Sequence, residues 1–150
     1  MSHPWTNVCS IFYWRPRFWK DIMFHRDLWW HIHEYYDMIV REEKILKSIL
    51  SRDVYDEYTM NRVTRVHGRI TSAWHSVKIC GNALREMKTK SKHIQITPLE
   101  FSISSGYRTA AYKVFRECRE LFLDAEVRTG RLSLIEREEC IEYVRKQRYQ

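Results

Sequence analysis

The sequence predicts an all-α protein, an antiparallel four-helix bundle of three long helices and one short helix, preceded by an aromatic and basic N-terminal arm. Only four glycines and three prolines occur in 150 residues, which is few for a β-sandwich or a loop-rich fold. No proline lies between Arg17 and Thr97, as long helices would require. Apolar residues also recur at helical spacing. We expect residues 1–18 to form the arm and residues 19–150 to form a single domain, since the length is that of one domain.

The first two long helices are predicted from two apolar stripes. The first helix is expected to begin at Asp21 as N-cap and to end at the break Ser51-Arg52-Asp53. The second helix contains Gly68 and Gly81, where we expect it to bend or split. The stripe residues of the first helix are Ile22, Trp29, Ile32, Tyr36, Ile39, Leu46 and Leu50, and those of the second are Val63, Val66, Ile70, Trp74, Val77 and Leu84.

The third and fourth helices have clearer start signals. Thr97 is followed by Pro98 and then Glu100, which is the pattern of a capped helix with proline at its first position. Gly130 predicts the end of that helix, and Ser133 with Glu136 repeats the capping box. The expected stripes are Ile103, Tyr107, Ala110, Val114, Cys118 and Leu121, and then Ile135, Cys140, Ile141 and Val144.

The positive charge is concentrated in the middle of the chain. The whole protein carries a formal charge of +7, and residues 59–98 alone hold eight basic residues against the single acid Glu86. Residues 21–58 carry more acidic than basic residues, and residues 99–150 carry nearly equal numbers of both. The basic residues of the middle segment are Arg62, Arg65, Arg69, Lys78, Arg85, Lys88, Lys90 and Lys92.

Arg62, Arg65 and Arg69 are expected to share one helical face, because their spacing places them within about 60° of one another. A polyanion would gain from such a row by releasing its counterions. The lysines from Lys88 to Lys92 are expected to extend this surface as a loop. The alternative is that the cations pair with carboxylates of the acidic segment across the bundle, and the candidates are Asp27, Glu34, Glu42 and Glu43.

The N-terminal arm interleaves aromatic and basic side chains. Trp14, Phe18 and Trp19 are candidates for stacking on bases or for contact with a partner subunit. The basic residues beside them, which could hold phosphates, are Arg15, Arg17 and Lys20. Packing of the aromatic residues against the protein's own core, or at a membrane interface, remains open at this point.

Other classes of function find little support in the sequence. There is no nucleophile elbow, phosphate-binding glycine loop or dinucleotide fingerprint, so we expect no enzyme, no small-molecule substrate and no cofactor. His31 and Glu34 could share a helical face, but the Glu-x-x-His motif of di-metal bundles is absent, and we expect no metal. Cys80, Cys118 and Cys140 are expected to be small apolar residues with free thiols. No apolar run is long enough to span a membrane, and the start does not resemble a secretory signal.

These observations favour a non-enzymatic, sequence-nonspecific nucleic-acid-binding structural protein that coats or packages DNA or RNA in a nucleocapsid-like way. We expect it to act as part of a homo-oligomer or larger assembly. The expected location is an intracellular reducing compartment or a virion, and not outside the cell. The alternative is a protein-binding helical subunit of a large complex, with the basic middle docked on an acidic partner. A small-ligand or metal-binding helical bundle is a third class.

Overall fold

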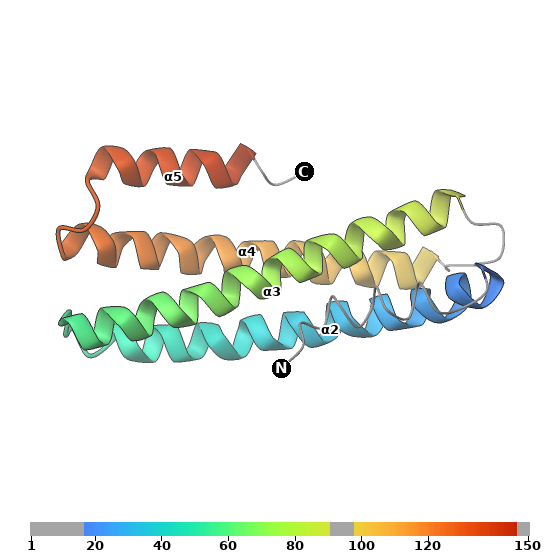
Figure 1. The fold of residues 1–150 in the computed structure, drawn as a ribbon, viewed down its shortest axis with the longest axis horizontal. Helices are drawn as coiled ribbons and strands as arrows, with labels where there is room; N and C mark the ends of the chain where they lie inside the picture. The colour runs from blue at the N-terminus through green and yellow to red at the C-terminus, as the bar shows by residue number, and fades with distance from the viewer. Residues whose placement is uncertain (1–16, 91–97, 147–150) are drawn as a thin grey trace.

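The computed structural model describes residues 17–90 and 98–146, and it confirms an all-α bundle of three long helices and one short helix (Figure 1). The helices are α2 (Arg17–Leu50), α3 (Glu57–Lys90), α4 (Pro98–Arg128) and α5 (Leu134–Lys146). Successive helices run in opposite directions. The three long helices pack on one another, whereas α5 lies along α4 on the outside of this group.

The helix boundaries follow local signals in the sequence. The backbone N–H of Thr59 donates to Asp56 Oδ1 at 2.7 Å and caps the start of α3. Pro98 is the first residue of α4, as expected. Gly130 follows α4 with a φ of 76°, the left-handed conformation that commonly ends a helix. At α5, the Glu136 N–H donates to Ser133 Oγ at 3.1 Å, and the Ser133 hydroxyl donates to Glu136 Oε1 at 3.0 Å.

Three boundary expectations were wrong. Asp21 does not cap a helix, because α2 already begins at Arg17. The helix α3 neither splits at Gly68 nor ends before Lys88, since it continues unbroken to Lys90. Lys88 and Lys90 are therefore helical rather than part of a loop. A glycine inside a long helix costs only about 1 kcal/mol, which the packing of α3 on both neighbouring helices offsets.

The core lies among α2, α3 and α4. All six residues predicted for the α3 stripe are buried. Trp74 is at the centre of this stripe, and its ring lies 5.4 Å from that of Tyr112 and 5.8 Å from that of Phe115, both on α4. On α2, the predicted residues Ile32, Ile39 and Leu46 are buried, and Tyr36 and Leu50 are partly buried against the core. Tyr35 and Ile49, which were not in the predicted stripe, are buried as well.

The predicted stripes of α4 and α5 were confirmed only in part. Tyr107 and Val114 of α4 and Val144 of α5 are partly buried and pack against the core. On α4, Cys118 is buried as predicted, but Ile103 is 38% exposed and the other buried positions include Ala111, Tyr112 and Phe115. The helix α5 has no buried residue. Ile135, the first residue of its predicted stripe, is 74% exposed.

One end of the bundle is closed by contacts between its turns. The turn after α2 contains Asp53 with a positive φ of 55°. The Asp53 carboxylate pairs with Arg128, the last residue of α4, at 2.9 Å. The Arg128 guanidinium also lies 4.4 Å from the centre of the Tyr55 ring. These contacts hold the end of α4 beside the turn between α2 and α3. They therefore help to set the position of α4 along α3.

Candidate polyanion-binding surface

The three arginines of the predicted face lie in the first half of α3. The Arg69 guanidinium pairs with the Glu42 carboxylate of α2 at 3.1 Å, so the alternative of pairing across the bundle holds at this residue. The Arg62 guanidinium lies 5.9 Å from the centre of the Tyr58 ring. Arg65 is exposed. The face therefore exists, but one of its three charges is already matched by a carboxylate.

A second group of cations forms where the C-terminal half of α3 lies beside α4. Lys78 and Arg85 are seven residues apart, so they share one face of α3. Arg108 of α4 reaches this face, where its Nη1 donates to Asn82 Oδ1 at 2.8 Å. We call Lys78, Arg85 and Arg108 the cationic cluster. It brings together two of the predicted residues and one that the sequence did not indicate.

Burial, and then a neighbouring cation, lowers the pKa of two members of the cationic cluster. Burial and, second, the proximity of Arg85 lower the pKa of Arg108. Burial and then Arg108 lower the pKa of Lys78. His75, one turn before Lys78, has a pKa lowered by burial and then by Lys78. An anion placed at this surface would relieve the repulsion, because opposite charge favours the charged form of each group.

The close approach of Arg108 to α3 depends on a glycine. A Cβ atom at Gly81 would lie 3.3 Å from Cδ of Arg108 and 3.4 Å from its Nη1. Contacts this short would push the arginine outward. Gly81 thus lets the Arg108 side chain lie across the surface of α3 and reach Asn82.

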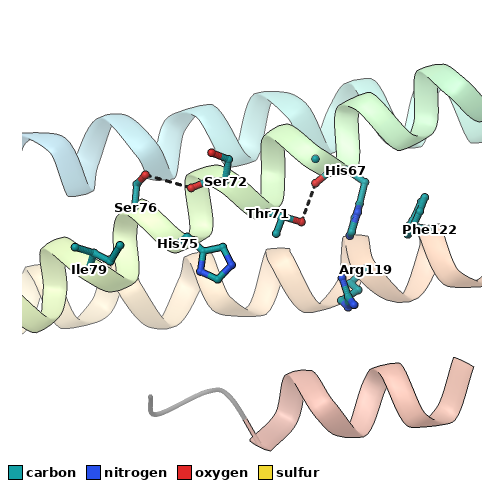
Figure 2. Close-up of a pocket in the computed structure, with 9 residues that line it drawn as sticks. His67, Thr71, Ser72, His75, Ser76, Ile79, Arg119 and Phe122 are labelled. Carbon is teal, nitrogen blue, oxygen red and sulfur yellow. Dashed lines mark hydrogen bonds between the residues drawn. The ribbon is translucent and has the colours of Figure 1, made fainter. Parts of the chain in front are cut away.

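An open groove runs along the outer surface of α3 before the cationic cluster (Figure 2). Gly68, Ser72 and Ser76 recur every four residues and line it with small side chains. The remaining lining residues come from both helices and are His67, Thr71, His75, Ile79, Arg119 and Phe122. We call this the α3 groove.

His67 is the most unusual residue of the α3 groove. It is only 6% exposed, and its ring stacks on that of Phe122 with 4.2 Å between centroids and 7° between planes. Burial and then the nearby Arg119 lower its pKa to about 4, so the imidazole is neutral at pH 7. Among the described residues, neither His67 Nε2 nor the Arg119 Nε has a hydrogen-bond partner, although both atoms are buried.

Several predicted site residues cannot be compared with the structure. Trp14, Arg15 and Lys92 lie outside the described residues. The side chains of a further group lie outside the described part although their backbone is helical; these are Arg17, Phe18, Trp19 and Lys20 in α2, and Lys88 and Lys90 in α3. The role of the arm therefore stays a prediction.

The remaining histidines and the cysteines have ordinary surroundings. His31 and His33 each lie 3.5 Å from a carboxylate of the next turn, Glu34 and Asp37 respectively. Within the described ranges, no three histidine, cysteine, aspartate or glutamate side chains gather as metal ligands would. Among the described cysteines, Cys80 and Cys118 are buried, Cys140 is half-buried, and none forms a disulfide with another. Burial raises the pKa of Cys118 to about 12.

None of the described helices combines the length and the apolar composition needed to cross a membrane. Comparisons with known protein families, with curated proteins and with solved structures found no match for this chain. The protein is therefore described by its own fold and surface, as an all-α bundle with a strongly basic central helix.

Proposed function

We propose that this protein is a non-enzymatic structural protein that binds nucleic acid without reading its sequence, as part of a larger assembly. The observation that carries the proposal is the cationic cluster, in which Lys78, Arg85 and Arg108 converge from two helices. Like charges held together in this way favour a ligand of repeated negative charge. A nucleic-acid backbone is such a ligand, and binding releases its condensed counterions.

The chemistry of the cluster supports contact with phosphates rather than with bases. Arginine and lysine donate to phosphate oxygens and fix the position of a protein on nucleic acid, but such contacts carry no sequence information. Arg108 already donates to Asn82, which orients its guanidinium across the surface. Arg62 and Arg65 lie about 140–160° around the axis of α3 from Lys78 and Arg85, so they are on a different side of the helix and outside this contact.

A second candidate function is docking of the basic helix on an acidic protein partner. The ion pair between Arg69 and Glu42 favours it, because a carboxylate already meets the arginine face at 3.1 Å. In this case the partner would present carboxylates at helical spacing. A polyanion with a different backbone, such as polyglutamate, would then compete as well as nucleic acid does.

A binding titration with matched charge variants separates these possibilities. The test variant is Lys78→Gln, Arg85→Gln and Arg108→Gln, and the control removes three exposed cations from α2 by Arg41→Gln, Lys44→Gln and Lys47→Gln. Fluorescence anisotropy would follow binding to labelled duplexes of two unrelated sequences. We expect both duplexes to bind equally, the test variant to bind at least about tenfold more weakly, and the control to bind like the unmodified protein.

Two outcomes would contradict the proposal. Equal weakening by both triple variants would show that only net charge matters and that the cluster is not the contact. Stronger binding of polyglutamate than of nucleic acid would favour the acidic protein partner. Circular dichroism would verify the fold of each variant, and the double variant Lys78→Gln with Arg85→Gln keeps the test valid if loss of Arg108 disturbs α3.

A further inference from the structure

The helix α5 is held to the bundle by one face only. Arg137, Cys140, Ile141 and Val144 are partly buried, Val144 packs against the core, and Arg137 Nε donates to Asp124 of α4 at 2.6 Å. The connection between α4 and α5 is short, and the Ser133 capping box fixes where α5 begins. The opposite face of α5 is left without a described neighbour.

That opposite face is acidic with an apolar start. Ile135, Glu138, Glu139 and Glu142 follow the spacing of one helical face, three to four residues apart. Ile135 is 74% exposed, and the side chains of Glu138 and Glu142 are 71% and 52% exposed. Glu138 and Glu142 also contact Arg137 and Arg145 of the same helix, at 2.7 and 3.5 Å. An exposed isoleucine followed by carboxylates suits a binding surface that combines apolar side chains with a cation.

The α3 groove has the complementary properties. Gly68 and Ser72 are exposed and allow a second helix to approach closely, and a Cβ atom at Gly68 would meet nothing within 4 Å, whereas Ser76 is only 2% exposed. The groove also contains buried nitrogen atoms of His67 and Arg119 that have no hydrogen-bond partner among the described residues. Buried donors of this kind are costly when unpaired, and a carboxylate is the acceptor that a guanidinium binds best.

The lengths of the two surfaces also agree. At 1.5 Å per residue, the 13 residues of α5 span about 20 Å. The groove from Gly68 to Ile79 spans about 17 Å by the same measure. The cation in the lining of the groove is Arg119 of α4.

We infer that the α3 groove receives α5 from a second copy of this chain. The outer face of α5 would lie along Gly68 and Ser72, with Ile135 against the apolar part of the groove and a glutamate accepting from Arg119. The chain's own α5 is kept from this position because its other face is bound to α4. The inference concerns only the assembly part of the proposed function, and it rests on that part.

The contact joins two different surfaces, so it is heterologous. Each copy offers one α5 and one α3 groove, and repetition of such a contact produces a closed ring or an open filament. The cationic cluster lies beyond the groove toward the end of α3. It would therefore remain available for nucleic acid in the assembled state.

The test is self-association of the full chain without nucleic acid, followed by sedimentation velocity over a range of concentrations. Gly68→Leu would fill the groove, and Gly106→Leu is its matched control, because Gly106 is also helical, exposed and open to a side chain. We expect the unmodified protein and Gly106→Leu to form oligomers. Gly68→Leu should remain monomeric or associate at least about tenfold more weakly.

A second pair of variants tests the other surface. Ile135→Lys changes the apolar start of the outer face of α5. Leu134→Lys makes the same change at a similarly exposed neighbour that points about 100° away. Ile135→Lys should abolish association, and Leu134→Lys should not. Mixing Ile135→Lys with Gly68→Leu leaves one intact surface on each partner, so the two monomers should combine into a one-to-one dimer that does not grow further.

The inference is overturned if the unmodified protein is monomeric at every concentration, if Gly68→Leu associates like Gly106→Leu, or if the two defective variants do not combine. The nucleic-acid proposal fails separately. Monomeric Gly68→Leu keeps the whole cationic cluster and should still bind duplex DNA, so loss of assembly with retained DNA binding would leave that proposal standing.

Discussion

His67 shows how burial of one side chain makes the stability of the bundle depend on pH. The imidazole lies against Phe122 and near Arg119, and its pKa is lowered from 6.5 to about 4. Between these two values the unfolded chain binds a proton that the folded protein does not bind. Acidification through this range therefore favours the unfolded state.

We predict that the free energy of unfolding falls by up to about 3 kcal/mol through His67 alone as the pH is lowered from 6.5 to 4. The contribution of the neutral His67 side chain to the free energy of unfolding is fully present above pH 6.5 and is lost near pH 4. His67→Phe keeps a ring against Phe122 but removes the titration. Chemical denaturation at several pH values should give a flatter profile for this variant, and an unchanged profile would contradict the assignment.

Arg108 shows where residue-level prediction from the sequence fails. Lys78 and Arg85 were predicted from the basic middle segment, because a charge excess is visible in the sequence itself. Arg108 lies in the near-balanced segment 99–150, where nothing distinguishes it from the other arginines. Its role depends on the register of α4 against α3 and on the space left by Gly81, neither of which a single sequence reveals.

At the scale of secondary structure, the helix ends that short motifs mark were predictable, whereas the start of α2 and the end of α3 were not. The capping box at Ser133, the proline at position 98 and the glycine at position 130 act through neighbouring residues, so the sequence shows them directly. The buried face of α4 depends on neighbours that are distant in the sequence. The helix α4 contacts α2, α3 and α5. Its buried residues therefore do not form the single stripe that packing against one neighbouring helix would give.

The Ser133 cap should control α5 alone. Ser133→Ala removes the acceptor of the Glu136 N–H and should destabilise α5 by about 1 kcal/mol. Since α5 has no buried residue, we expect faster amide hydrogen exchange in α5, with little change in the exchange of α2 and α3 or in the global unfolding transition. A matching loss of global stability would contradict this, because it would mean that α5 folds cooperatively with the bundle.

At the scale of the whole molecule, the excess positive charge was predictable, but its distribution was not. The sequence placed it in residues 59–98, and the structure divides the described part of this segment between two sides of one helix. Arg69 faces the acidic α2 and pairs with Glu42, whereas Lys78 and Arg85 join Arg108 beside α4. This division depends on which neighbour supplies carboxylates, and therefore on tertiary packing.

The most direct test of the central claim, that the cationic cluster contacts phosphates, is the salt dependence of duplex binding. For the unmodified protein, the logarithm of the association constant should fall linearly with the logarithm of the salt concentration. Loss of Lys78, Arg85 and Arg108 as cations should reduce the slope by about 2 to 3, since each phosphate contact contributes about 0.9. The α2 control should keep the original slope. An unchanged slope for the cluster variant would contradict the claim.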